Sequence, residues 1–146
     1  MRIIIFANGN LPNLEKARAL IHPEDFILCA DGGTRHAIAL GLTPNVIIGD
    51  LDSVTDRERQ KMKEANVEIV EFPRDKNETD LELAITHALS LNPEDVLILA
   101  ALGGRMDQTL ANIALLSNLQ LAVCNIKITD GVEEIFFCRD QTQVEG

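Results

Sequence analysis

The segment Val46–Ser53 (VIIGDLDS) places a short apolar run directly before a glycine and two aspartates. The run Phe26–Ala30 (FILCA) is followed in the same way by the acidic turn Asp31-Gly32-Gly33. Short, continuous apolar runs bounded by turn residues are typical of strands buried on both faces of a parallel sheet. We therefore expect each of these strands to end at a turn that carries carboxylates.

Similar apolar runs recur along the chain and alternate with amphipathic, helix-like stretches. The expected strands are Arg2–Ala7, Phe26–Ala30, Val46–Ile48, Val67–Phe72 and Val96–Ala100. This alternation predicts βαβ units around a mostly parallel sheet. The predicted fold class is α/β, a Rossmann-like three-layer sandwich, and a chain of 146 residues with 46% hydrophobic residues is long enough to bury one such core.

Two helix starts are marked by capping boxes, in which a Ser or Thr precedes a Glu by three residues. Thr55–Glu58 and Thr79–Glu82 both fit this pattern. We expect Asp50 and Asp52 to lie in the loop before the first of these helices, and Asp80 to lie in the first turn of the second. The second helix then carries a buried stripe at helical spacing, formed by Leu81, Ala84, Ile85, Ala88 and Leu89.

The alternation ends beyond Asn118. Lys127–Thr129, the pair Asp130-Gly131 and Glu134–Cys138 together predict a hairpin with a tight Asp-Gly turn. We therefore expect an α/β domain over residues 1–126, and over residues 127–146 a hairpin that begins a second, β-rich unit, most of which is absent from the chain.

Composition narrows the classes of partner. With 13 Lys and Arg against 23 Asp and Glu, the formal net charge is −10, which argues against a surface built to bind nucleic acid. The apolar run Ile3–Ala7 is far too short for a secretory signal or a membrane span. Cys29, Cys124 and Cys138 are odd in number and suit reduced core thiols better than disulfides. We expect a cytoplasmic protein with no nucleic-acid or membrane partner.

Asp50 and Asp52 are the first candidate metal ligands. A spacing of two in extended backbone points both carboxylates to the same side of the chain. Mg²⁺ binds one or two protein carboxylates and completes its shell with water and phosphate oxygens. The alternative is a pair of solvated loop aspartates, with Asp52 and Ser53 as turn residues. Asp80 has an alternative role as well, because the helix dipole favours an acidic first turn without any metal.

Two glycine-containing turns are candidate phosphate contacts. The glycines of Asp31-Gly32-Gly33 leave room for backbone amides to approach a phosphate. In Gly103-Gly104-Arg105, the guanidinium of Arg105 is suited to bidentate phosphate binding; the alternative is a flexible turn with a solvated Arg. Asp107 then either orients Arg105 or caps a helix beginning near Gln108. Because parallel strands end at one edge of a sheet, these turns predict a Mg²⁺–nucleotide site there.

Taken in order, four motifs resemble those of the thiamine pyrophosphokinase (thiamine diphosphokinase) family. They are Ala30–Gly33, Gly49–Ser53, Asp75–Asp80 and Leu102–Gln108. The resemblance covers essentially the whole chain as that family's N-terminal catalytic domain. It implies Mg²⁺-dependent transfer of a pyrophosphoryl group from ATP to the hydroxyl of thiamine, giving thiamine diphosphate and AMP, by a homodimer.

The resemblance also implies roles for individual residues. Asp50, Asp52 and Asp80 are similar to the Mg²⁺ ligands, with Asp31 assisting, and together with Arg105 they form the implied catalytic set. The implied ATP contacts are Asp31, Gly32, Gly33, Ser53, Thr79, Gly103, Gly104, Arg105, Asp107 and Gln108. The family's C-terminal β-domain supplies much of the thiamine pocket and the dimer interface, and only its approach, Val132–Gly146, is present here.

Two other functions fit the residues. One is pyrophosphoryl transfer to another small alcohol, such as a pterin, on a related fold. The other is a non-catalytic Mg²⁺–nucleotide binding module. Neither a dinucleotide fingerprint nor a P-loop is present in the sequence. The general base is not identified by the sequence, although Asp31 and Asp107 are candidates.

Overall fold

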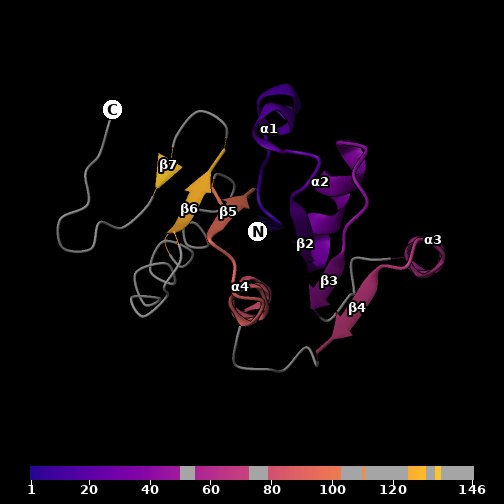
Figure 1. Ribbon diagram of the computed structural model, residues 1–146. Coiled ribbons are helices and arrows are strands. Elements are labelled where there is room, and N and C mark those ends of the chain that lie inside the picture. The colour runs from indigo at the N-terminus through magenta and orange to yellow at the C-terminus, as the bar shows by residue number, and fades with distance from the viewer. Residues whose placement is uncertain (50–54, 73–78, 103–109, 111–124, 131–133, 136–146) are drawn as a thin grey trace.

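One sheet organises the molecule. The computed structural model describes residues 1–49, 55–72, 79–102, 110, 125–130 and 134–135. Within these residues, seven strands form a single sheet in the order β4-β3-β2-β1-β5-β6-β7 (Figure 1). The strands are β1 (Arg2–Phe6), β2 (Phe26–Ala30), β3 (Val46–Gly49), β4 (Glu68–Glu71), β5 (Asp95–Leu99), β6 (Asn125–Thr129) and β7 (Glu134–Ile135). All neighbours pair in parallel except β6 and β7, which confirms the mostly parallel α/β fold.

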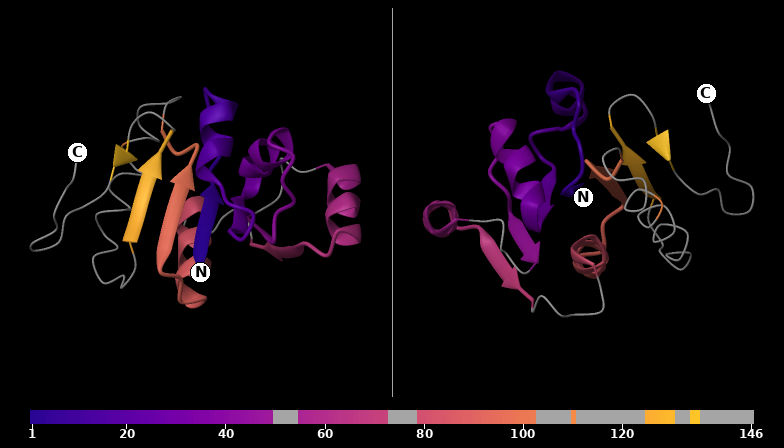
Figure 2. Two further views of the ribbon diagram at one scale, coloured as in Figure 1. Left: turned by 45° about the horizontal axis from the view of Figure 1, so that its top comes forward. Right: turned by 180° about the vertical axis from the view of Figure 1, so that it is seen from behind.

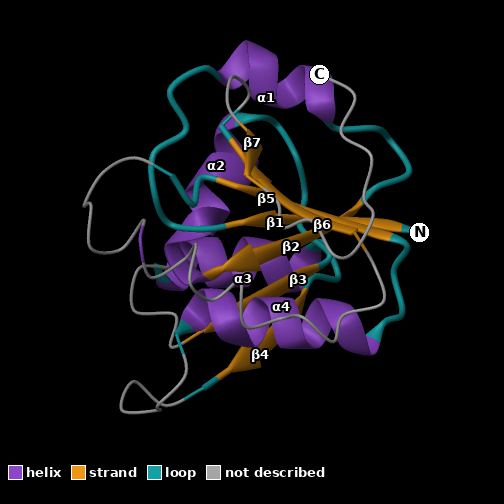
Figure 3. Ribbon diagram, turned by 90° about the vertical axis from the view of Figure 1, so that its left-hand side faces the viewer, coloured by secondary structure: helices purple, strands orange, loops and turns teal. Residues whose placement is uncertain are grey.

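Helices cover both faces of the sheet. They are α1 (Leu14–Leu20), α2 (Thr34–Ala39), α3 (Asp56–Glu64) and α4 (Asp80–Ser90), with a short 3₁₀ turn, η1 (Asp31–Gly33), before α2. Side chains alternate between the faces along each strand: Ile3 and Ile5 pack with α4, whereas Ile4 packs with α1, α2 and α3. Figure 3 shows α1 and α4 on opposite sides of the sheet. The expected three layers are confirmed.

Local signals fix where the helices begin and end. The Oγ1 atoms of Thr55 and Thr79 accept hydrogen bonds from the backbone N–H groups of Glu58 and Glu82, each at 3.1 Å, so both predicted N-caps are confirmed. At the other ends of α3 and α4, Asn66 and Asn92 adopt left-handed backbone with φ of 62° and 54°. Asn tolerates this conformation, which ends a helix and turns the chain toward the next strand.

The C-terminal strands belong to the same sheet. β6 pairs in parallel with β5, from Asp95 opposite Asn125 to Leu99 opposite Thr129, and β7 pairs antiparallel with β6. The predicted pairing of the two strands is confirmed, with Thr129 opposite Glu134. The Asp130-Gly131 turn stays a prediction, since residues 131–133 lie outside the described part of the chain. The parallel arrangement therefore extends through β6. A second, β-rich unit stays a prediction, since residues 136–146 lie outside the described part of the chain.

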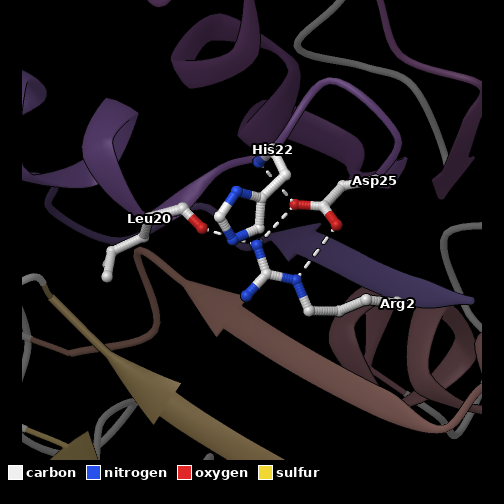
Figure 4. A network of polar contacts seen from close by, with 4 residues as sticks. All are labelled: Arg2, Leu20, His22 and Asp25. Atoms are coloured by element: carbon white, nitrogen blue, oxygen red, sulfur yellow. Dashed lines mark hydrogen bonds and ion pairs between the residues drawn. The ribbon is translucent and has the colours of Figure 1, made fainter.

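A polar network links residues near the amino-terminal end of β1 (Figure 4). The Arg2 guanidinium donates to both carboxylate oxygens of Asp25, at 3.0 and 2.5 Å, and to the carbonyl oxygen of Leu20 at 2.5 Å. The backbone N–H of His22 donates to the same carboxylate at 2.8 Å. These bonds fasten the segment between α1 and β2 to the start of β1, at the end of the strands opposite the carboxyl edge.

Two further expectations concern burial and membranes. Cys29 is a free thiol, fully buried in β2, and burial raises its pKa, as expected for an unreactive core cysteine. Cys124 and Cys138 lie outside the described residues. In the portion of the chain that the structure describes, no helix has both the length and the apolar character needed to cross a bilayer.

Candidate active site

The candidate site lies along the carboxyl edge of the sheet. Figure 2 shows β1, β5 and β6 side by side, with their arrowheads directed to one edge. The residues that follow β1, β2 and β3 meet at this edge because the strands pair in register, with Phe6 opposite Cys29 and Ala30 opposite Ile48. The strand order reverses between β1 and β5, since the chain moves outward through β4 and then returns to the other side of β1. Open α/β sheets bind ligands at such reversal points.

Asp31 is held in an unusual backbone conformation directly after β2. Its φ is 41°, which few residues other than glycine adopt, and its residue exposure is 8%. The buried hydroxyl of Thr34 donates to the carbonyl oxygen of Asp31 at 2.8 Å. Gly33 lies so close to the carbonyl oxygen of Phe6 that it has no room for a side chain. The turn is therefore fixed by close packing against the end of β1 as well as by its own hydrogen bonds.

Asp80 reaches the same place from α4. The Thr79 cap fixes the first turn of the helix, and α4 packs across β1, β2 and β3. Gly49, whose φ is 146°, lies close to both aspartates. A Cβ atom on Gly49 would lie 2.9 Å from Cβ of Asp31 and 3.2 Å from both Cγ and Oδ1 of Asp80. The Oδ1 atoms of both aspartates are buried. Thus the structure brings together two of the four predicted carboxylates, beside the residue that precedes Asp50.

The other predicted site residues are not described. Asp50, Asp52, Ser53, Gly103, Gly104, Arg105, Asp107 and Gln108 all lie outside the described residues, so the structure does not test their predicted placement. Among the predicted residues that are described, Gly32 and Gly33 lie in η1 with Asp31, and Thr79 caps α4. Within the described ranges alone, no group of three or more His, Cys, Asp and Glu side chains is placed to hold a metal ion.

Sequence reasoning missed a polar cluster at this edge. Arg35 in α2 donates from one guanidinium nitrogen to Oδ1 of Asn8, and from the other to the carbonyl oxygens of Asn8 and Gly9, at 3.3 and 3.1 Å. Nε2 of His36 donates to the carbonyl oxygen of Gly9 at 2.8 Å. The Asn-Gly pair directly after a predicted strand was the one signal available, and it predicts only a turn.

The surroundings of the His36 ring favour its neutral form. Burial lowers the pKa of His36, the hydrogen bond to Gly9 opposes this, and the positive charge of Arg35 lowers the pKa further, so the net pKa lies below the usual value. A carbonyl oxygen only accepts, so the proton of the neutral ring is on Nε2. The clustered donors of α2 therefore face the loop after β1, whereas Asp31 and Asp80 lie close to Gly49.

Comparison with known proteins identifies the family. The sequence profile described as "Thiamin pyrophosphokinase, catalytic domain" matches residues 17–128, more than half of the chain. The chain belongs to this family. The matched range contains Asp31, Gly49 and Asp80, and it ends within β6.

Curated relatives cover the chain in part. A protein named thiamine pyrophosphokinase from Bacillus subtilis is 37% identical over 86 residues, which are 59% of this chain and 40% of that protein. Thiamine pyrophosphokinase 1 from Oryza sativa subsp. japonica is 28% identical over 121 residues, which are 66% of this chain and 46% of that protein. The chain thus spans less than half the length of both curated relatives.

Solved structures agree with this assignment. The crystal structure of thiamine pyrophosphokinase from Bacillus subtilis has a TM-score of 0.73 at 29% identity, and the match covers 88% of this chain and 60% of that chain. The thiamin pyrophosphokinase family protein from Enterococcus faecalis has a TM-score of 0.72 at 29% identity, with 88% of this chain and 61% of that chain covered. The Candida albicans enzyme shares the fold, with a TM-score of 0.66 at 16% identity, covering 87% of this chain and 57% of that chain.

Proposed function

We propose that the chain provides the ATP-binding part of a thiamine pyrophosphokinase, which transfers a pyrophosphoryl group from ATP to the hydroxyl of thiamine. Membership of the family supports this proposal. The structural observation that carries it is that Asp31 and Asp80 both lie close to Gly49, at the carboxyl edge of the sheet. Two acidic side chains at the ligand-binding edge of an α/β sheet suit a metal–nucleotide complex.

We infer that Asp50, Asp52 and Asp80 hold Mg²⁺ and that Asp31 assists. The described residues fit this ion, because hard divalent cations bind carboxylate oxygens, and Asp31 and Asp80 lie close to Gly49 with buried Oδ1 atoms. Asp50 is joined to Gly49 by a single peptide bond. When bound, Mg²⁺ would neutralise negative charge on the phosphates. ATP, the proposed co-substrate, is an anion, and the positive charge of this ion would offset its repulsion by the acidic side chains.

We further propose that the remaining predicted residues contact the nucleotide. These are Gly32, Gly33, Ser53, Thr79, Gly103, Gly104, Arg105, Asp107 and Gln108. The turn of η1 supports this role for the first two glycines, since a phosphate can approach backbone where no side chain intervenes. Arg105 is suited to neutralise the phosphate charge that develops as the group is transferred.

The proposed reaction depends mainly on the correct positioning of thiamine and ATP relative to each other. The hydroxyl oxygen of thiamine forms a bond to the β-phosphorus, the bond from that phosphorus to the oxygen bridging the α-phosphorus breaks, and AMP leaves while the hydroxyl proton is lost. Alignment of the attacking oxygen with the leaving oxygen is the part that a protein scaffold can supply. We propose that a C-terminal β-domain, which the resemblance to the family implies, completes the thiamine pocket. We also propose that the active enzyme is a cytoplasmic homodimer.

An assay of AMP formation from ATP, Mg²⁺ and thiamine tests the proposed function, and it is run beside calorimetric titration of Mg²⁺–ATP. We expect Mg²⁺-dependent ATP binding, with thiamine-dependent AMP formation. Thiamine analogues should inhibit the reaction. Binding without any AMP formation would favour a nucleotide-binding module, and AMP formation that requires a different alcohol would contradict thiamine as the substrate.

The metal assignment is tested separately by Asp52→Asn. We expect this variant to bind ATP more weakly in the presence of Mg²⁺ while the fold is retained, because one carboxylate ligand is lost. Asp56→Asn, at an exposed position in the first turn of α3, makes the same change in charge and should bind as the wild type does. An unchanged Mg²⁺-dependent affinity in Asp52→Asn would remove Asp52 from the site.

A further inference from the structure

We propose that Arg35 and His36 are positioning residues of the nucleotide site, which hold the segment Asn8–Gly9 in place at the point where the strand order reverses. The inference rests on the proposed function, because it concerns the same site. It adds two residues from α2 to the proposed nucleotide site, whose other residues lie in the turns that follow the strands and at the start of α4. These residues act through the loop, and no contact between them and a substrate is part of the proposal.

The side chains of Arg35 and His36 both form hydrogen bonds with the segment Asn8–Gly9. The two terminal nitrogens of the Arg35 guanidinium bond three acceptors: Oδ1 of Asn8, the carbonyl oxygen of Asn8, at 3.3 Å, and that of Gly9, at 3.1 Å. The ring of His36 donates to the same Gly9 carbonyl oxygen at 2.8 Å. A planar guanidinium makes several directed bonds at once, whereas a single ammonium group acts as a point charge. The geometry of this contact is therefore specific to Arg.

The end of β5 holds the loop from the other side. The backbone N–H of Gly9 donates to the carbonyl oxygen of Ala100 at 2.6 Å, and that of Ala7 donates to Leu99 at 2.8 Å. Gly9 has no room for a side chain beside Ala100. Ala100 has a φ of 63°, an unfavourable conformation for a residue with a Cβ atom. The loop is thus fixed between α2 and β5, which lie on either side of β1.

The same loop contacts the turn that carries Asp31. The side chain of Asn8 lies so close to Gly32 that any side chain at Gly32 would collide with it. Arg35 bonds this Asn8 side chain, and η1 continues directly into α2. If the segment Asn8–Gly9 moves, the turn Asp31–Gly33 therefore loses its packing contact with the side chain of Asn8. Strained backbone of the kind seen at Asp31 and Ala100 persists only where the surrounding contacts enforce it.

The expected loss of Mg²⁺–ATP affinity depends on the fraction of time that the segment Asn8–Gly9 spends in the conformation that allows binding. If removing the Arg35 bonds leaves the loop correctly placed for about one tenth of the time, the apparent dissociation constant rises about tenfold. Amide hydrogen exchange at Gly9 reports the same loosening without any ligand, because its N–H bonds Ala100. Both quantities are measured on the full chain, with Mg²⁺–ATP as the ligand for calorimetry and with no ligand for exchange.

Four variants separate positioning from charge and from size. Arg35→Gln and Arg35→Lys should both weaken Mg²⁺–ATP binding about tenfold and speed exchange at Gly9, because neither reproduces the guanidinium fork. His36→Leu should act in the same direction. His36→Gln should restore binding in large part, since its amide nitrogen can donate in place of Nε2. If one of the variants fails to fold, those at the other position still test the inference.

Two controls complete the experiment. Arg57→Gln, at an exposed position in α3, makes the same change in charge as Arg35→Gln and should leave binding unchanged. Asp25→Asn weakens the network at the opposite edge of the sheet and should lower stability without changing affinity.

The outcomes separate this inference from the proposed function. A wild-type chain that does not bind Mg²⁺–ATP would contradict the proposed function. A wild-type chain that binds, with Arg35→Gln affinity within about twofold of it or with unchanged exchange at Gly9, would overturn the inference alone. Full recovery by Arg35→Lys would show that Arg35 acts through its charge, which also overturns it.

Discussion

At the scale of single residues, Gly49 allows Asp31 and Asp80 to lie close to the end of β3. Its φ of 146° and the closeness of Asp31 and Asp80 leave no comfortable place for a Cβ atom. Gly41 provides a matched comparison, because it also has a positive φ, 74°, but a Cβ atom there would meet nothing within 4 Å. Both positions have a positive φ, and only Gly49 is crowded.

We predict that Gly41→Ala lowers the free energy of unfolding by about 1–2 kcal/mol, the usual cost of left-handed backbone for a residue with a Cβ atom. Gly49→Ala should lower it by about 1–3 kcal/mol more, because the added methyl group crowds Asp31 and Asp80. Urea denaturation followed by circular dichroism measures both. Only Gly49→Ala should also weaken Mg²⁺–ATP binding, and equal losses of stability would show that the two aspartates yield to the methyl group without cost.

The second residue-scale prediction concerns Asp25, whose side chain is 5% exposed. Burial raises the pKa of Asp25, but the hydrogen bond from Arg2, the backbone N–H of His22 and nearby positive charge together outweigh it, so the net pKa lies below 3.8. Since the folded chain binds the proton less readily than the unfolded chain, this stabilisation is complete above about pH 3.8 and is lost as the pH falls through the lower, folded-state pKa.

We predict that Asp25→Asn costs about 2 kcal/mol at pH 7, the size expected for hydrogen bonds to a charged group. The difference in stability between the wild type and this variant should shrink as the pH falls below about 3.8. Urea denaturation at a series of pH values from about 7 to about 3 measures it. Glu24→Gln, at the exposed neighbouring position, is the control and should show little loss. A difference that stays constant across the pH range would contradict the role assigned to the Asp25 charge.

At the scale of elements, the caps of α3 and α4 are alike in geometry but differ in location. Thr55 and Thr79 make the same bond at the same length. The first turn of α4 carries Asp80 to Gly49, whereas the first turn of α3 follows the residues predicted to bind metal. A capping defect in α4 therefore moves a described carboxylate of the site.

We predict that Thr79→Ala and Thr55→Ala each lower the free energy of unfolding by about 1 kcal/mol. Thr79→Ala should in addition weaken Mg²⁺-dependent nucleotide binding more than Thr55→Ala does, because fraying of α4 displaces Asp80. Thermal unfolding and calorimetric titration of both variants measure the two effects. Equal affinities in the two variants would show that the position of Asp80 does not depend on its cap.

Elements with local causes could be predicted from the sequence. The apolar runs before Asp31 and Asp50 indicated their strands, and Thr79 indicated the start of its helix through Glu82, three residues later. The contacts of Arg35 with Asn8 and Gly9 join residues that are 27 and 26 positions apart, and no local pattern encodes them. The pairing of Thr129 with Glu134 agrees with the two strands predicted on either side of the Asp-Gly signal, whereas the parallel pairing of β6 with β5 is a property of the whole sheet.

At the scale of the whole molecule, binding and stability are linked. A ligand that binds only the folded state raises the free energy of unfolding according to its concentration relative to its dissociation constant. The candidate site lies at the carboxyl ends of β1, β2, β3 and β5 and at the start of α4, so binding there engages several strands of the sheet. Global unfolding is therefore a sensitive measure of occupancy.

We predict that Mg²⁺–ATP at about one hundred times its dissociation constant stabilises the chain by about 2.7 kcal/mol. EDTA should abolish this gain, because the proposed carboxylate ligands repel the phosphates once the cation is removed. The rise in the unfolding midpoint with increasing Mg²⁺–ATP measures it, and MgCl₂ without nucleotide is the control. An equal rise with ATP in EDTA would contradict a metal-bridged site.

The position of β4 at one margin of the sheet has a consequence for solubility. The edge of a terminal strand is a template to which a second chain can add, and natural proteins often protect such edges with charge. Glu68 and Glu71 on β4 are exposed, and the half-buried Ile69 and Val70 lie between them. Glu71 also forms an ion pair with Arg59 at 3.6 Å, so charged side chains occupy this margin and make it a poor template for a second copy. Part of the chain's net negative charge therefore protects it against polymerising into extended sheets, a requirement separate from the proposed metal-binding carboxylates.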